Sequence, residues 1–242
     1  MRDGPLNYFD VPLLEWLDER IVGWMNSHAG EWPQWERWVL LAAFNDLLKG
    51  AVPVVVLWSL WMGGDAGSRD ARRRHLLALV VSILAALGVN RALASALPHR
   101  PRPLHDDNIE FIVPTDMNRF AFSDLSAFPS DHAVMFFGLA VGVFLIAKRT
   151  GSVLLLHAGL VVLPARVYLG LHWATDVLAG GLIGAGFAWV GTRTLFSRPL
   201  GRPLLHWEAR HPASFYPLFF LLTWQLCALF DPVVQLARRV FE

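Results

Sequence analysis

Apolar positions along the chain gather in six long stretches that polar and charged connections separate. The stretches cover 38–62, 76–97, 133–147, 152–169, 174–195 and 214–230. A helix that crosses the hydrocarbon core of a bilayer needs roughly 20 apolar residues, and flanking residues can lengthen the shorter stretches. Glycine and alanine recur within them, which favours close packing between membrane helices. The pattern therefore predicts an all-α, polytopic membrane bundle of about six transmembrane helices.

The first 37 residues have a different pattern, in which apolar positions recur at helical spacing between acidic and basic ones. We expect one or two helices that lie on the membrane surface, although ordinary amphipathic packing gives the same pattern. Three tryptophans suit an interfacial aromatic belt: Trp32, Trp35 and Trp38. The sequence thus predicts one domain over 1–242, with surface helices in 1–37 and a transmembrane core in 38–235.

Composition agrees with a membrane protein. Of the 242 residues, 55% are hydrophobic and only 17% are charged, and the mean hydropathy is +0.41, whereas soluble domains carry about 25% charged residues. The net charge of +1 gives no reason to expect nucleic-acid binding. A single cysteine, Cys227, excludes an internal disulfide framework and a multi-cysteine zinc or iron–sulfur site.

Basic residues in the connections predict the orientation of the helices. They gather in three connections: Arg69, Arg72, Arg73 and Arg74; Lys148 and Arg149; and Arg193, Arg198, Arg202 and Arg210. By the positive-inside rule these connections face the cytoplasm, so the acidic segment 98–131 and the turn near His172 face outside. The same alternation puts the N-terminal segment outside, together with Arg238 and Arg239, although the rule disfavours basic residues there.

Three polar clusters, 99–103, 128–132 and 166–176, fall at helix ends on the predicted outer side. Charged groups beside membrane spans are costly and are usually functional. The first and third clusters supply three arginines: Arg100, Arg102 and Arg166. Guanidinium groups grip a phosphate with two parallel hydrogen bonds, so these arginines point to a phosphate ligand.

The second and third clusters add groups that can carry out chemistry on a phosphate ester. Ser130 can cap a helix that opens at Asp131, so that the amides of its first turn face an anion. His172 and Asp176 are four residues apart and share a helix face, where the carboxylate can fix the imidazole tautomer. A neutral imidazole can attack phosphorus, and His132 can move the proton. This set of residues describes a phosphate-ester site with no metal and no cofactor.

Each cluster also has a plainer explanation. Pro-Arg runs often end a helix at a membrane surface, Ser130 could serve only as a cap, and a lone histidine at a helix end is more often packed or solvated than catalytic. Their combination on one side of the membrane favours the functional interpretation.

These motifs resemble those of the type 2 phosphatidic acid phosphatase superfamily of membrane lipid phosphatases. The segment 129–132 reads Pro-Ser-Asp-His, one of the forms of the family's second motif, and the third motif is matched by Arg166, Gly170, His172 and Asp176. The resemblance covers about 45–186. It implies a phosphohistidine on His172, oriented by Asp176, with His132 acting on the leaving group and then on water.

The resemblance also implies the substrate contacts. It assigns phosphate binding to Arg102, Ser130 and Arg166, and we add four nearby residues as candidates: Arg100, Asp131, Gly170 and Arg91. The first family motif places a lysine seven residues before its Arg-Pro, but Ser95 stands there before Arg102 and Leu93 before Arg100. Either arginine could be the family's, and we favour Arg102.

A missing lysine is a feature of the bacterial undecaprenyl diphosphatase branch, which the chain resembles most. We expect Lys49, from the cluster Asn45, Asp46 and Lys49, or Arg91 to replace that lysine in balancing a diphosphate. The alternative is that Asp46 and Lys49, three residues apart, only neutralise each other.

The resemblance implies a metal-independent phosphatase in the bacterial inner membrane, with its site facing the periplasm. The expected reaction converts undecaprenyl diphosphate to undecaprenyl phosphate. Alternatives are the same chemistry on phosphatidylglycerol phosphate, phosphatidic acid or lipid A, a lipid phosphotransferase, and a non-catalytic lipid carrier or scaffold. The expected partner is a lipid phosphate in the membrane, and the sequence predicts neither the lipid tail nor an oligomeric state.

Overall fold

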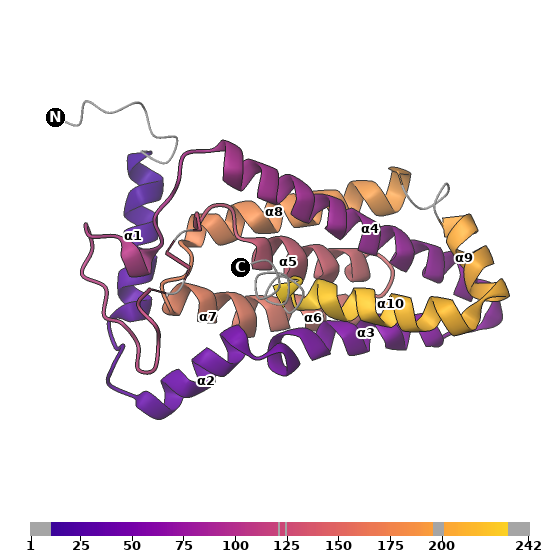
Figure 1. Ribbon diagram of the computed structural model, residues 1–242, viewed down its shortest axis with the longest axis horizontal. Coiled ribbons are helices and arrows are strands. Elements are labelled where there is room, and N and C mark those ends of the chain that lie inside the picture. The colour runs from indigo at the N-terminus through magenta and orange to yellow at the C-terminus, as the bar shows by residue number, and fades with distance from the viewer. Residues whose placement is uncertain (1–10, 121, 124, 196–200, 232–242) are drawn as a thin grey trace, which may run out of the picture.

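The computed structural model describes residues 11–120, 122–123, 125–195 and 201–231, and these residues form helices and connections without a β-strand (Figure 1). The helices are α1 (Pro12–Asn26), α2 (Pro33–Phe44), η1 (Leu47–Ala51), α3 (Val52–Met62), α4 (Ala66–Ala96), η2 (Pro103–His105), α5 (Asp131–Phe144), α6 (Lys148–His157), η3 (Ala158–Val162), α7 (Leu163–Tyr168), α8 (Ala174–Val190), η4 (Gly191–Leu195), α9 (Gly201–Arg210) and α10 (Pro212–Cys227). Prolines begin several of them, because the first turn of a helix leaves its amides unbonded.

The all-helical fold is confirmed and includes helices that could cross a membrane, but the expected number of spans is not confirmed. Among the described residues, three helical segments are long and apolar enough to cross a membrane: Gly67–Ala96, Lys148–Tyr168 and Ala174–Arg193. The predicted span 38–62 is instead a pair, Pro33–Phe44 and Leu47–Met62, bent by 58°. If this bent pair is one span, the described residues contain four candidate spans. α5 is apolar but has only 14 residues.

Asn45 explains the break in the first span. Its side-chain Oδ1 accepts hydrogen bonds from the amides of Leu47 (2.9 Å) and Leu48 (3.2 Å), and its own backbone is extended. An asparagine that bonds the following amides offers the backbone an alternative to the helix. The chain therefore turns at Asn45 and resumes as the π-helical η1, which contains Lys49.

The centre of the bundle is α5, which packs against α4, α6 and α8. The contact with α8 depends on Gly180 and Gly184, since a Cβ at either position would collide with the carbonyl oxygen of Ser130 or Val134. The close helix packing expected from small residues is thus confirmed at this pair of helices. It fixes the start of α5 against the start of α8, where the second and third polar clusters lie.

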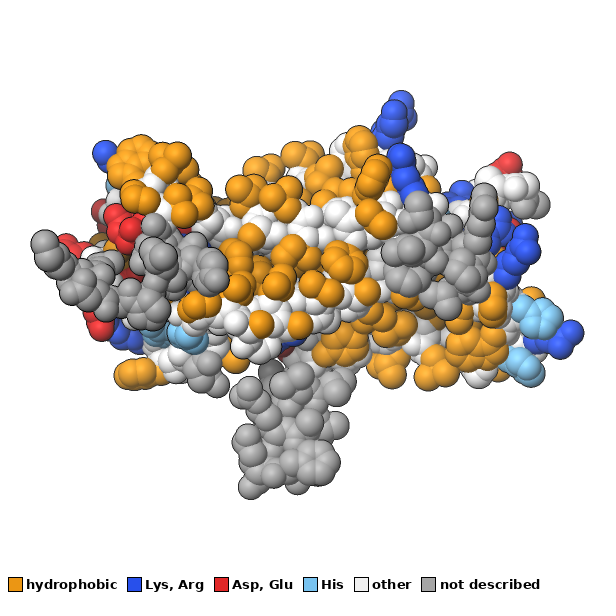
Figure 2. All heavy atoms as spheres, turned by 90° about the horizontal axis from the view of Figure 1, so that it is seen from above, with side chains coloured by type: hydrophobic (Ala, Val, Ile, Leu, Met, Phe, Trp, Pro, Cys, Tyr) orange, Lys and Arg blue, Asp and Glu red, His pale blue; other side chains and the backbone are white. Residues whose placement is uncertain are grey.

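The two ends of the bundle differ in charge. In Figure 1, α1, the segment 98–130 and the start of α8 lie at one end, and α9 lies at the other. Figure 2 shows acidic side chains at the first end, basic ones toward the second and a broad apolar surface between them. Arg73 pairs with Glu208 of α9 at 2.8 Å, so the basic connection after α3 belongs to the α9 end. Arg198, Arg238 and Arg239 lie outside the described residues.

α1 shows its polar face to the protein and its apolar face to the outside. Asp18, Val22 and Asn26 are buried, whereas Trp16 and Trp24 are exposed. Such reversed amphipathy suits a helix at the edge of a bilayer. The side chain of Asn26 exchanges two 2.7 Å hydrogen bonds with the backbone of Ile112, which ties the long segment 98–130 to α1.

Candidate active site

The three predicted clusters meet at a cavity of about 1090 Å³. Its lining includes these polar or charged residues: Asp46, Lys49, Asn90, Arg91, His99, Arg102, Asp131, His132, Arg166, His172 and Asp231. They come from η1, the outer part of α4, the segment 98–130, the start of α5, α7, the turn before α8 and the end of α10. Segments far apart in the chain therefore converge on one polar hollow, lined by four cations, three carboxylates and three histidines.

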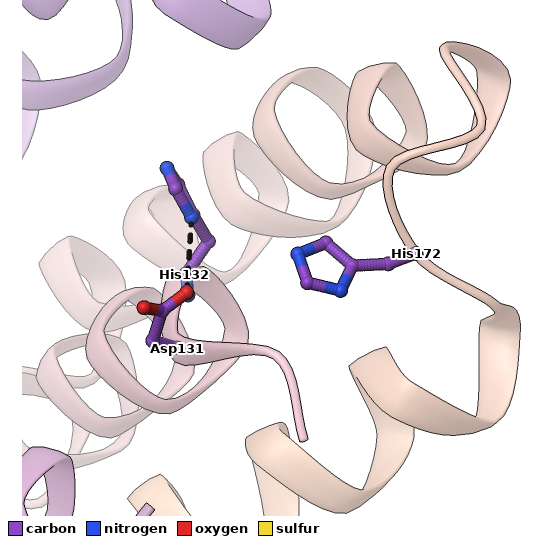
Figure 3. Close-up of side chains that lie close together, drawn as sticks. All are labelled: Asp131, His132 and His172. Carbon is purple, nitrogen blue, oxygen red and sulfur yellow. Dashed lines mark hydrogen bonds and ion pairs between the residues drawn. The ribbon is translucent and has the colours of Figure 1, made fainter. Parts of the chain in front are cut away.

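His132 and His172 project toward the same space from different elements (Figure 3). His132 stands on the first turn of α5, and His172 lies in the turn before α8. Ligand atoms of Asp131, His132 and His172 lie within 4.8 Å of one another. Such a set could hold a divalent cation, but Arg102 and Arg166 act electrostatically on the same imidazole and oppose a cation there.

The hydrogen bonds of His172 fix its tautomer. Nδ1 lies 2.9 Å from the carbonyl oxygen of Ala127, and because a carbonyl only accepts, Nδ1 carries the proton. Nε2 is then unprotonated and has a lone pair. Burial lowers the pKa of His172, Asp176 raises it, and Arg102 and Arg166 lower it again. The imidazole is therefore held neutral, as a nucleophile requires.

Asp176 is placed differently from the sequence-based expectation. Its Oδ2 lies 3.8 Å from Nδ1 of His172, beyond hydrogen-bond distance, and accepts instead from the amide of Trp173 at 2.7 Å. Its Oδ1 accepts from Arg100. Asp176 thus acts on His172 through its charge, while the carbonyl of Ala127 holds the ring.

His132 is buried, and neither of its ring nitrogens has a hydrogen-bond partner within the described part of the chain. An oxygen of Asp131 lies 3.5 Å from Nδ1 of His132. Ser130 caps α5 as predicted, since its hydroxyl accepts from the amide of Ala133 at 3.4 Å. The imidazole lies at a capped helix start beside the cavity, where it can exchange a proton with a ligand.

Arg102 and Arg166 are buried in the cavity wall and hydrogen-bonded to main-chain carbonyls. Arg102 donates to the carbonyls of Leu171 and Ser126, and Arg166 donates to that of Ala43 at 3.3 Å. No carboxylate of the described residues lies within ion-pair distance of Arg166. These contacts fix both guanidinium groups in the cavity wall, and planar guanidinium groups held in this way suit an anionic ligand.

Two phenylalanines cover these arginines. Phe122 lies against Arg102 and Phe44 against Arg166, with ring centres 5.4 and 5.5 Å from the guanidinium carbons. The two rings stack on each other at 6.3 Å. Together they form one wall of the cavity.

Lys49 and Arg91 also line the cavity, each with an acidic partner. Nζ of Lys49, which is 3% exposed, lies 3.2 Å from Asp46, so the predicted pairing is confirmed. Arg91 is exposed and pairs with Asp131 at 2.6 Å. Asp131, predicted to contact substrate, is thus the counter-ion of Arg91 and the neighbour of His132.

Three residues predicted to bind substrate are not among those that line this cavity: Arg100, Ser130 and Gly170. Arg100 pairs with Asp176 and, at 2.7 Å, with Asp18 of α1. Gly170 has a φ of +67°, a region that favours glycine, and a Cβ there would meet the ring of Phe111. Of the two Arg-Pro arginines, Arg102 therefore lines the cavity, whereas Arg100 pairs with Asp176 outside the cavity lining.

Sequence reasoning missed Asp18, Asn90 and Asp231. Asn90 donates to the carbonyl of Pro129 at 3.2 Å and so holds the loop before α5. Asp231 lines the cavity just past α10. Asp18 could have been found from its pattern, because it lies on the same face of α1 as Asn26, opposite the tryptophans.

Comparison with known proteins shows the family of the chain. The PAP2 superfamily model matches residues 75–199, more than half of the chain. The chain belongs to the PAP2 superfamily. The match contains every motif residue from Arg100 to Asp176, whereas Asp18 and Lys49 lie outside it.

Three curated proteins resemble this PAP2 chain. The "Putative undecaprenyl-diphosphatase YbjG" of Escherichia coli (strain K12) is 29% identical over 177 residues, which cover 71% of this chain and 79% of that protein. The bacitracin transport permease protein BcrC of Bacillus licheniformis is 34% identical over 82 residues, 34% of this chain and 40% of BcrC. The undecaprenyl-diphosphatase of Sulfolobus acidocaldarius is 30% identical over 90 residues, 37% and 43% of the two chains. No solved structure matches the chain. This PAP2 protein is a phosphatase of the membrane.

Proposed function

We propose that this phosphatase hydrolyses undecaprenyl diphosphate to undecaprenyl phosphate and inorganic phosphate through a phosphohistidine on His172. The observation that carries the proposal is the state of His172: Nδ1 bonds the carbonyl of Ala127 at 2.9 Å, and the ring borders a cavity shared with His132, Arg102 and Arg166. A binding protein would need the arginines but not an oriented nucleophile.

The first step forms a bond between Nε2 of His172 and the terminal phosphorus, and breaks the bond from that phosphorus to the bridging oxygen. Arg102 and Arg166 hold the non-bridging oxygens and stabilise the negative charge that gathers on them. The amides at the start of α5, capped by Ser130, add to this stabilisation. The negative charge of the bound diphosphate favours the protonated form of His132, which gives its proton to the departing lipid phosphate.

The second step returns the enzyme to its starting state. His132, now neutral, takes a proton from a water molecule as that water attacks the phosphohistidine. The N–P bond breaks, inorganic phosphate leaves, and His172 recovers its lone pair. The negative charge of Asp176 stabilises the cationic imidazole during both steps.

Lys49 and Arg91 support a diphosphate as the substrate. They are two further cations beside Arg102 and Arg166 in the cavity wall, each next to an acidic partner, and a diphosphate has a second phosphate for them to contact. The names of YbjG and of the Sulfolobus protein agree with this choice. We place the reaction at the periplasmic side of the bacterial inner membrane, since the cavity lies at the acidic end of the bundle, away from the basic connections.

Phosphate release from a panel of lipids tests the proposal. Purified protein, with a chelator present, is given C55 diphosphate, phosphatidylglycerol phosphate and phosphatidic acid in separate reactions. We expect C55 diphosphate to give the highest kcat/KM, and His172→Ala to abolish release while His206→Ala, at an exposed position on α9, leaves it unchanged. A preference for either other lipid would replace the proposed substrate, and a tenth or more of wild-type activity in His172→Ala would exclude the phosphohistidine route.

A further inference from the structure

A buried charge network lies behind His172, and α1 supplies one of its members. Arg100 pairs with Asp176 through Nη1 and with Asp18 through Nη2, the latter at 2.7 Å. Asp18 and Asp176 are 1% and 0% exposed. Asp18 is 82 positions from Arg100 in the chain and outside the part that the family model matches.

Asp18 also holds the first turn of α8. Its Oδ1 accepts from the amide of Thr175 at 2.9 Å, and its Oδ2 accepts from the hydroxyl of Thr175. A carboxylate at a helix start satisfies an unbonded amide and interacts favourably with the helix dipole. Asp18 therefore contacts both the arginine that holds Asp176 and the turn from which Asp176 projects.

Counted over its three described members, the network carries one negative charge in excess. Asp18 and Asp176 contribute two negative charges, and Arg100 contributes one positive charge. If Arg100 had only Asp176 as a partner, the two would form a neutral pair beside His172. Because Asp18 neutralises Arg100, the negative charge of Asp176 can stabilise a cationic imidazole of His172.

We propose that Asp18 is a positioning residue of the reaction, which neutralises Arg100 so that Asp176 can stabilise the cationic imidazole of phosphorylated His172. This inference rests on the proposed phosphohistidine mechanism. It makes α1, a helix whose apolar face is exposed, part of the catalytic apparatus rather than only a membrane contact.

The pH dependence of catalysis reports this charge balance. Catalysis needs neutral His172, so the acid limb of kcat/KM follows the titration of that residue. The charged groups that act on His172 are Asp131, Asp176, Arg102 and Arg166, together with His132 and, through Asp176, Arg100. The more distant ionisable groups of the cavity are Asp46, Lys49, Arg91, His99 and Asp231.

The test compares two variants with opposite changes of charge. Asp18→Asn removes a negative charge behind His172, so the acid limb should move to lower pH by about half a unit or more, and kcat should fall about tenfold while KM stays nearly constant. Arg100→Gln removes a positive charge, so the acid limb should move to higher pH. The double variant restores the wild-type net charge, and its acid limb should return toward the wild-type position.

Two further variants separate a charge effect from a packing effect. Asp18→Glu keeps the charge and should keep the wild-type acid limb. Glu19→Gln removes the same charge from an exposed position on α1 and should change nothing. If Asp18→Asn does not yield folded protein, the comparison of Arg100→Gln with the double variant measures the same removal of Asp18. Shifts in the same direction in Asp18→Asn and Arg100→Gln, or no shift in either, would overturn the proposal.

The proposal and the proposed function can fail separately. If wild-type protein releases no phosphate from any lipid of the panel, the proposed function fails. The titration of the imidazole C–H signal of His172, measured by NMR and assigned by its absence in His172→Ala, still reports the opposite shifts without substrate. Active wild-type protein whose variants show no opposite shifts refutes the role of Asp18 alone.

Discussion

Lys49→Met tests whether the cavity is built for a diphosphate. Lys49 is 3% exposed, lines the cavity and lies 3.2 Å from Asp46. Methionine keeps the apolar stem and removes the charge, which leaves Asp46 without its partner beside the ligand. If a phosphate oxygen binds at about 6 Å from Nζ, the attraction is about 3 kcal/mol at an effective dielectric constant of about 20. Asp46 offsets about half of this, so about 1.4 kcal/mol, or tenfold in kcat/KM, should be lost.

The assay measures kcat/KM for C55 diphosphate and for phosphatidic acid, a monoester. The loss should be at least tenfold for the diphosphate and smaller for the monoester, because the monoester has no second phosphate for Lys49 to contact. Lys148→Met, at an exposed position where α6 begins, is the matched control and should keep wild-type activity. Unchanged kcat/KM for the diphosphate in Lys49→Met, and also in Arg91→Met, would refute the reasoning and leave the diphosphate to Arg102 and Arg166.

Three further predictions follow from the site. Activity should persist in EDTA and be inhibited by orthovanadate, which occupies the phosphoryl position; activity that chelation removes and zinc or magnesium restores would contradict a metal-free site. Burial, Arg102 and Arg166 together lower the pKa of His172, so its neutral form should persist on acidification. The acid midpoint of kcat/KM should therefore lie below the ordinary histidine pKa of about 6.5. A midpoint above that value would show that the imidazole is not held neutral. In intact cells a membrane-impermeant maleimide should label Asn108→Cys but reach Asp70→Cys only after permeabilisation, with buried Cys227 giving no background; the reverse pattern would invert the proposed orientation.

Local spacing allowed part of the site to be predicted. Ser130 caps α5 because a serine before a helix start does so by local geometry, and Lys49 pairs with Asp46 because residues three apart in a helix are neighbours. The spacing of His172 and Asp176 correctly placed the two side chains near each other, at 3.8 Å.

Contacts between distant segments could not be predicted in the same way. The partner of Nδ1 in His172 is the main-chain carbonyl of Ala127, 45 positions away. Every residue has such a carbonyl, so the alanine at this position does not predict the contact. The pairing of Arg100 with Asp18 depends on where α1 docks, which no local pattern specifies.

The number of spans was the weakest part of the fold prediction. Hydropathy alone treated 38–62 as one continuous helix, because a window average hides a single polar residue. The side-chain hydrogen bonds of Asn45 break that helix, and the same break brings Lys49 to the cavity. The polar cluster at Asn45, Asp46 and Lys49 therefore indicated both the bend between α2 and η1 and a wall of the cavity.

The central claim, a phosphohistidine on His172, is tested most directly by acid-free rapid quench of the enzyme with C55 diphosphate that carries ³²P in its terminal phosphate. The account predicts a label on wild-type protein that is stable in alkali, lost in acid and absent from His172→Ala. Turnover of the substrate by wild-type protein with no protein-bound label, or an equal label in His172→Ala, would contradict it.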